Sequence, residues 1–264
     1  MRRLVALDLD GTLLTYESTL PEGHARAIRE LTRRGILVAI ATGRTVTNAR
    51  WVGKALGLTT PLIAFNGGWV GVPDHPPLAQ LPLTGAETRE ILAALADLDG
   101  TRCAYPDAYG WWIDRDDRIG GWRSVYHCPI TCIPEAFEAW EGPSHKVMFV
   151  TDPDLLEHAA KTVRARLGGR FQVVVSQHDR FEIMPFAVTK AWGLARLADH
   201  LGVHRDNVWA VGDADNDLEM IAWAGHGVVM GQAHPRIHRH ARHVLPGIQA
   251  RGLCALPLLM DRHG

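Results

Sequence analysis

The stretch LVALDLDGTLL, residues 4–14, decides the fold. Leu4 to Leu9 is a short apolar run suited to a buried strand, and Asp8 and Asp10 stand at its end, before Gly11. We expect the two carboxylates to share one face, because side chains two residues apart lie on the same side of an extended backbone. For this motif alone, a plain strand-end turn of Asp and Gly is the alternative.

Strands alternate with helices on both sides of a central interruption. Before it, the pattern predicts a helix over Pro21 to Arg34, a strand over Ile36 to Ala41, a helix over Val46 to Leu56 and a strand over Pro61 to Phe65. After it come a helix over Thr189 to Leu201, a strand over Asn207 to Val211, a helix over Asp217 to Ala222 and a strand over Gly227 to Met230. Apolar strands joined by helices predict an α/β, Rossmann-like parallel sheet covered on both faces. Ligands of such sheets bind beyond the carboxyl ends of the strands.

The interruption has a different pattern, typical of an inserted α+β module. Paired strands are predicted over Thr101 to Tyr105 with Gly110 to Asp114, and over Phe171 to Val175 with Arg180 to Met184. Helices are predicted over Ala86 to Leu98 and over Pro153 to Leu167. A further strand is predicted over His145 to Val150. We therefore expect one domain from residues 1–82 and 186–264, and a second from residues 83–185. Six aromatic side chains of the insert are candidates for substrate specificity, although packing is the commoner reason for such residues: Tyr105, Tyr109, Trp111, Trp112, Trp122 and Tyr126.

Composition excludes several classes of partner. The 28 Lys and Arg residues against 29 Asp and Glu residues give a net charge of -1, so there is no basic field to hold nucleic acid or an anionic membrane. Four irregularly spaced cysteines among 264 residues indicate no disulfide framework. No window holds the roughly 20 apolar residues of a membrane span, and Asp8 and Asp10 interrupt the first apolar run, so we expect a cytoplasmic protein.

Three later segments carry groups suited to phosphate and metal. Thr42-Gly43-Arg44 opens a helix, where a hydroxyl and backbone amides can bind an anion, or where Thr42 can simply cap the helix. Lys190 could offset phosphate charge, although a lone lysine usually lies on the surface. Residues 212–217, GDADND, place four polar side chains on one tight loop, and such a density of carboxylates is costly unless a cation such as Mg²⁺ offsets it: Asp213, Asp215, Asn216 and Asp217.

These groups suit phosphoryl chemistry. Asp8 as a nucleophile would divide hydrolysis into the formation and breakdown of an aspartyl-phosphate, and Mg²⁺ would neutralise the repulsion between the two anions. Asp10 would protonate the leaving oxygen and then deprotonate the attacking water. Gly11 and Thr12 would let the chain turn away sharply.

In this order and spacing, DLDGTLL, TGR, Lys190 and GDADNDLEM resemble the haloacid dehalogenase (HAD) superfamily, specifically its Cof-type phosphatases with a type 2 cap, as does FEIMP before Lys190. The resemblance covers nearly the whole chain and implies a HAD core with an α+β cap that closes over the site. It implies Asp8 as nucleophile and Mg²⁺ ligand, and Asp10 as acid and base that also gives its backbone carbonyl to the metal. The remaining roles that it implies are metal ligation by Asp213, support of that site by Asp217, and phosphate binding by Thr42, Gly43, Lys190 and Asn216.

Some features lie outside this resemblance. Relatives often have Gly after the lysine and Asn in the loop where this chain has Ala191 and Gln232, which affects details of helix approach and substrate contact. Asp215 has no assigned role. The histidine-rich segment, residues 234–243, is expected to form a solvated surface helix on which His234 and His238 share a face.

The favoured function is hydrolysis of a small phosphomonoester, such as a sugar phosphate, through an aspartyl-phosphate. A phosphomutase or phosphotransferase acting on sugar phosphates is the enzymatic alternative. A non-catalytic protein that only binds a phosphorylated metabolite is a third possibility, but such a protein needs neither Asp8 nor Asp10. The expected partner is a small phosphorylated metabolite, and the sequence leaves the oligomeric state open.

Overall fold

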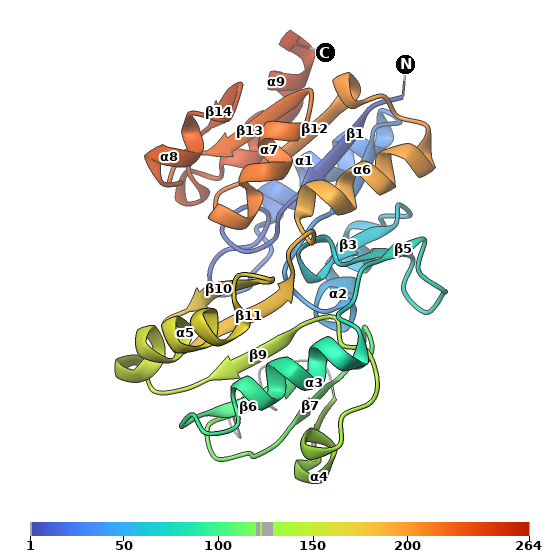
Figure 1. Ribbon diagram of the computed structural model, residues 1–264. Coiled ribbons are helices and arrows are strands. Elements are labelled where there is room, and N and C mark those ends of the chain that lie inside the picture. Colours follow the sequence, from blue (N-terminus) through green and yellow to red (C-terminus); the bar gives the residue numbers. More distant parts are fainter. Residues whose placement is uncertain (1, 120–121, 123–128, 264) are drawn as a thin grey trace. The chain divides into compact units, whose positions relative to one another are not determined.

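The computed structural model describes residues 2–119, 122 and 129–263 (Figure 1). The chain forms two compact units. The first contains Met1–Arg44, Ala49–Gln80 and Thr189–Gly264, and the second contains Thr45–Asn48 and Leu81–Val188. Both ends of the chain therefore belong to the first unit, and nearly all of the second comes from one continuous segment.

A parallel sheet forms the centre of the first unit, with its five strands in the order β14-β13-β12-β1-β2. In register, Ala6 of the central strand lies beside Ala210 on one side and Ala39 on the other. The predicted α/β parallel core is confirmed. Its strands are β1 (Leu4–Leu7), β2 (Leu37–Ile40), β12 (Val208–Gly212), β13 (His226–Met230) and β14 (His243–Leu245).

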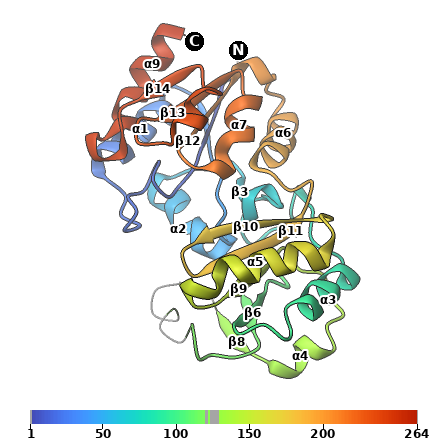
Figure 2. The ribbon, with the colours of Figure 1, turned by 60° about the vertical axis from the view of Figure 1, so that its left-hand side comes forward.

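Helices cover both faces of this sheet. Leu4 and Ala6 pack against Leu194 of α6 and Met220 of α7, and α1 lies on the opposite side of the sheet (Figure 2). The Thr189 hydroxyl accepts the Trp192 N–H, which caps the start of α6. The helices are α1 (Glu22–Arg33), α2 (Val46–Leu56), α6 (Lys190–Leu201), α7 (Leu218–Trp223), α8 (Pro235–His238) and α9 (Leu256–His263).

The third predicted strand joins the parallel sheet only weakly. β3 (Leu62–Ala64) meets β2 through a single parallel bridge between Ala41 and Ile63, and it starts a separate antiparallel sheet with β4 (Trp69–Gly71) and β5 (Ala79–Gln80). The sequence analysis did not predict β4 or β5. The chain reverses because Asn66 and Gly67 adopt φ of 55° and 102° in the short helix η1 (Phe65–Gly67), and a Cβ on Gly67 would lie 2.0 Å from the Thr189 carbonyl oxygen.

The predicted surface helix over residues 234–243 is wrong. The helix α8 ends at His238, and His243 begins β14, which pairs in parallel with β13. The physical reason is the short apolar run Val244-Leu245, in which Leu245 is buried at the edge of the sheet. His234 lies before α8, where its ring accepts the Arg236 N–H.

A six-stranded sheet organises the second unit, in the order β10-β11-β9-β6-β7-β8, and all its pairings are antiparallel except that of β7 with β8. Both predicted strand pairs, β6 with β7 and β10 with β11, are confirmed. The elements are β6 (Thr101–Ala104), β7 (Trp111–Ile113), β8 (Ile130–Cys132), β9 (Val147–Val150), β10 (Phe171–Gln177), β11 (Arg180–Pro185), α3 (Gly85–Ala94), α4 (Pro134–Glu138) and α5 (Pro153–Leu167).

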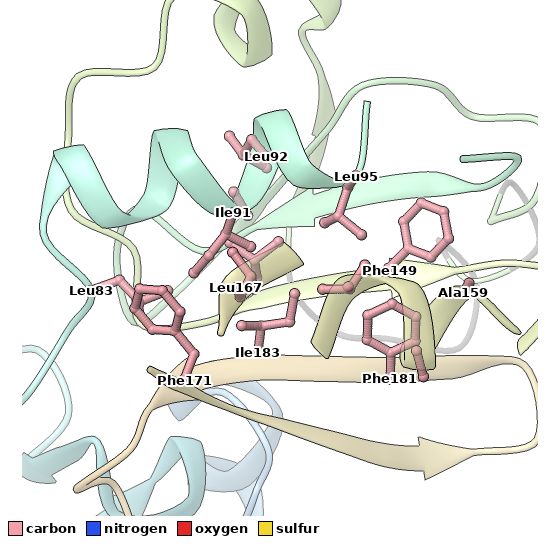
Figure 3. Close-up of a cluster of buried hydrophobic side chains, with 14 of the residues drawn as sticks. Leu83, Ile91, Leu92, Leu95, Phe149, Ala159, Leu167, Phe171, Phe181 and Ile183 are labelled. Carbon is pink, nitrogen blue, oxygen red and sulfur yellow. The ribbon is translucent and has the colours of Figure 1, made fainter. Parts of the chain in front are cut away.

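Apolar side chains from α3, α5 and this sheet meet in one cluster, in which Ile91 and Leu167 lie near Ile183 and Phe181 lies near Phe149 (Figure 3). Two of the aromatic specificity candidates, Tyr105 and Trp111, are buried and lie with ring centroids 5.4 Å apart, so packing accounts for them. Tyr126 lies outside the described residues.

Candidate functional site

The predicted site residues gather at the carboxyl ends of β1 and β12, within the first unit. β1 ends at Leu7, and the Asp8 N–H donates to the Val211 carbonyl of β12 at 3.0 Å. Asp8 and Asp10 therefore lie in the turn after the strand, so strand alternation does not set the relation of their side chains, contrary to the sequence-based argument.

Three buried carboxylates form an acidic cluster, consisting of Asp8, Asp213 and Asp217. One oxygen of each lies within 4.8 Å of the others. Lys190 is completely buried, and its Nζ donates to Asp8 Oδ1 at 2.5 Å and to Asp217 Oδ1 at 2.6 Å. With all three carboxylates ionised, the single ammonium would leave this buried group with an excess of negative charge.

Burial and repulsion between the carboxylates act on the pKa of Asp8 in the same direction, and the charge of Lys190 opposes them. Burial raises the pKa of Asp8 well above its usual range and Asp217 adds to this, whereas Lys190 opposes it. Burial also raises the pKa of Asp213, against the hydrogen bond from Thr12. For Lys190, burial alone would lower the pKa, but Asp217 and Asp8 outweigh it and the pKa is raised. A divalent cation would relieve the repulsion among the carboxylates, and hard oxygen donors are those that Mg²⁺ prefers.

The loop η4 (Asp215–Asp217) and the turn after β1 hold these carboxylates in place. Asp217 Oδ2 accepts the N–H groups of Asp213 at 2.9 Å and Ala214 at 3.0 Å. Asp213 Oδ1 accepts the Thr12 hydroxyl at 2.7 Å, and Asp213 Oδ2 accepts the Tyr16 hydroxyl at 3.2 Å. The sequence analysis gave Tyr16 no role, and nothing in its local pattern marks it.

One glycine permits the close approach of the two loops. Gly11 has φ of 85°, and a Cβ there would lie 2.4 Å from Asp213 Oδ2. Its carbonyl accepts Gln232 Nε2 at 2.6 Å, while Gln232 Oε1 accepts the Ile248 N–H at 2.9 Å. Gln232 is one of the two positions at which this chain departs from the pattern it resembles. It ties the turn after β1 to the segment after β14.

Asp10 is held by Arg44. Arg44 Nε donates to Asp10 Oδ2 at 2.9 Å, Nη2 donates to Asp10 Oδ1, and Nη2 also donates to Ser18 Oγ at 2.7 Å. The Asp10 side chain is nearly half exposed. Arg44 of the TGR segment had no predicted role; the bidentate pair shows that it holds the Asp10 carboxylate in place.

The predicted phosphate-binding residues other than Lys190 meet around Asn66. Asn216 Nδ2 donates to Asn66 Oδ1 at 2.9 Å, and the Asn66 N–H donates to the Thr42 carbonyl at 2.9 Å. A Cβ on Gly43 would lie 2.9 Å from Asn66 Oδ1, so Gly43 is also adjacent. Asn66 had no predicted role. The dipeptide Asn66-Gly67 is the sequence signal that could have marked it, because Asn and Gly tolerate the positive φ that both adopt here.

Asp215 points away from the acidic cluster. It forms an ion pair with Arg236, whose Nε donates to Asp215 Oδ1 at 2.7 Å, and both side chains are more than half exposed. A surface pair of this kind contributes about 0–1 kcal/mol to stability. The loop therefore separates Asp215 from Asp213 and Asp217.

Comparisons with known proteins agree on a family. A sequence profile described as haloacid dehalogenase-like hydrolase matches residues 5–254. An HMP-PP phosphatase of Cronobacter sakazakii is 31% identical over 251 residues, which cover 92% of this chain and 89% of that protein. A crystal structure of a Thermotoga maritima protein has a TM-score of 0.86 at 24% identity, covering 100% of this chain and 98% of its own.

A sugar phosphatase of HAD subclass IIB shares the fold as well. Its TM-score is 0.83 at 18% identity, and the match covers 98% of this chain and 99% of that one. Among the residues that the structure describes, no helix is long and apolar enough to cross a membrane.

Proposed function

Because the chain belongs to the haloacid dehalogenase-like hydrolases and is a phosphatase of that superfamily, we propose that it hydrolyses a small phosphomonoester through a phosphorylated Asp8. One observation carries the proposal. Lys190 bridges Asp8 and Asp217 inside a buried group of three carboxylates, an arrangement suited to a metal and a phosphate and costly without them.

The donor set fits Mg²⁺. We propose Asp8 and Asp213 as its carboxylate ligands and the Asp10 backbone carbonyl as a third, with Asp217 holding the loop through its contacts with the Asp213 and Ala214 amides. When bound, Mg²⁺ supplies positive charge that offsets the repulsion between these carboxylates and the substrate phosphate.

The proton and the phosphoryl group would move in two stages. Asp8 attacks phosphorus, the bond from phosphorus to the leaving oxygen breaks, and Asp10 gives that oxygen a proton. Asp10 then takes a proton from water, which attacks the phosphorus of the phosphorylated Asp8 and restores the carboxylate. Both Asp10 oxygens accept from the Arg44 guanidinium, and each keeps a second lone pair that can take the proton.

Four residues would hold the phosphate during both stages. We assign this role to Lys190, Thr42, Gly43 and Asn216. An ammonium has three N–H donors, and among the described residues two of those of Lys190 meet carboxylates, so the third can reach a phosphate oxygen. Thr42 and Gly43 lie between β2 and α2; the Thr42 N–H donates to the Ile63 carbonyl at 2.9 Å, so the Thr42 hydroxyl is the donor that we propose for the phosphate.

The substrate is proposed from the relatives. The HMP-PP phosphatase and the sugar phosphatase point to a small phosphorylated metabolite. Sugar phosphates are the first phosphomonoester candidates, and HMP-PP is a diphosphate candidate beside them. We propose that residues 83–185 act as a cap that selects the substrate, and that the enzyme works in the cytoplasm.

A panel of phosphorylated metabolites tests the proposal. With Mg²⁺ present, the protein should release inorganic phosphate from at least one of them, and from a generic aryl phosphate. Asp8→Asn should abolish this release without unfolding the protein, and Asp10→Ala should impair it severely. Conversion of a sugar phosphate into its isomer without phosphate release would contradict hydrolysis in favour of a mutase.

A further inference from the structure

Two histidines lie side by side on the ring of Trp209, in the first unit. Trp209 of β12 is in register with His226 of β13, and β13 pairs in turn with β14, which begins at His243 (Figure 1). The indole and the His226 ring are stacked with centroids 4.1 Å apart and planes 2° apart. The His243 ring is 5.2 Å from the indole at 13° and 5.7 Å from the His226 ring at 13°. The planes of the two imidazoles are therefore nearly parallel.

Their nearest nitrogens have a separation that suits a metal better than a shared proton. His226 Nδ1 and His243 Nε2 are 3.4 Å apart. Hydrogen bonds donated by N–H groups are typically about 2.7–3.2 Å long, so a bond at this distance is weak. Two imidazole nitrogens bound to one tetrahedral Zn²⁺, each at about 2.0–2.1 Å, are about 3.4 Å apart.

The surroundings keep both rings neutral and accessible. Burial lowers the pKa of His226, and Arg242 and His263 add to this while Asp206 opposes it. Burial also lowers the pKa of His243, and His263, His226 and Arg242 add to this. Neutral imidazole is the form that binds metal, and both side chains remain partly exposed to solvent.

We propose that His226 Nδ1 and His243 Nε2 chelate a transition-metal dication of the Zn²⁺ type, with water completing the coordination. Imidazole nitrogen selects Zn²⁺, Ni²⁺ or Cu²⁺ over the Mg²⁺ that the carboxylate cluster suits. The site is separate from that cluster: Trp209 precedes Asp213 by four residues along β12, which corresponds to about 13 Å of strand. The indole fixes both rings, so little side-chain entropy is lost on binding.

Zinc titration of the intact protein with Mg²⁺ in saturating excess tests this. In ¹H–¹⁵N spectra of the histidine rings, Zn²⁺ should shift Nδ1 of His226 and Nε2 of His243. In calorimetry, one site should weaken at least about tenfold in His226→Gln and in His243→Gln. His240→Gln is the matched control, because His240 is exposed and outside the pair, and it should bind zinc as the parent does.

Two results would overturn the site. One is zinc affinity within about threefold of the parent in both folded variants, where threefold is well under 1 kcal/mol. The other is a zinc-induced shift confined to other histidines. The spectra of the parent decide the question even if a variant fails to fold.

Discussion

Replacing Lys190 by Met removes the one ammonium of the acidic cluster and leaves its shape nearly unchanged. Loss of one partner from a buried ion pair costs about 3–5 kcal/mol, and Lys190 contacts two carboxylates, so the free energy of unfolding without metal should fall by at least that range. With Mg²⁺, phosphate release should drop about 10²–10³-fold, the usual effect of removing one preorganised donor to developing charge.

The affinity for Mg²⁺ should increase in the same variant. Lys190→Met removes one positive charge from the cluster, so Mg²⁺ should bind the variant more tightly than the parent. Tenfold tighter binding adds about 1.4 kcal/mol to the stabilisation by saturating metal. Urea unfolding of both proteins with and without Mg²⁺ measures this difference.

Lys146→Met is the matched control. Lys146 is also buried, and its Nζ contacts Glu182 Oε1 at 2.6 Å, but it lies in the second unit. Its loss should destabilise the protein while the gain from Mg²⁺ stays at the parent value. Equal stabilisation of the two variants by Mg²⁺ would refute the reasoning. Activity of Lys190→Met within about threefold of the parent would also refute it, because threefold in rate is under 1 kcal/mol.

Three further changes test other parts of the structure. Gly11→Ala and Gly35→Ala should each lower the free energy of unfolding by about 1–2 kcal/mol, because both residues have positive φ. Only Gly11→Ala should also lower phosphate release, since its Cβ would meet Asp213 whereas a Cβ on Gly35 would meet nothing within 4 Å. Equal activity of the two variants would contradict this. EDTA should stop phosphate release and added Mg²⁺ should restore it, and turnover that persists in EDTA would exclude a metal requirement. Burial lowers the pKa of His145 to about 4, so between pH 6.5 and 4 the unfolded chain binds more protons than the folded chain. The free energy of unfolding should therefore decrease by up to about 3 kcal/mol as the pH is lowered through this range. Urea unfolding of His145→Gln should lack this effect.

The sequence predicted well those elements that depend on local patterns. The helices Val46–Leu56 and Pro153–Leu167 begin and end at the predicted residues, because Gly or Pro and an amphipathic repeat mark their bounds. The gathering of Asp8 and Asp213 followed from the rule that parallel strands bring their carboxyl ends to one edge. Lys190 begins α6, and only the family resemblance had linked it to the site.

Features made by contacts between distant segments were not predictable. The strand β14 is three residues long and forms only because β13 offers an open edge, so its histidine-rich surroundings suggested a helix instead. The Arg44 pair with Asp10 spans 34 residues, and the link from Asn216 to Asn66 spans 150. The hydrophobic periodicity of a sequence does not indicate which polar side chains meet across such separations.

The central claim is that Asp8 carries the phosphoryl group during turnover. Acid quench of the enzyme during hydrolysis, followed by borohydride reduction, converts a phosphorylated aspartate into homoserine, which peptide mass spectrometry locates in the chain. The proposed mechanism predicts homoserine at position 8 and none in the Asp8→Asn variant. Reduction at any other residue, or phosphate release with no reducible intermediate in the parent, would contradict it.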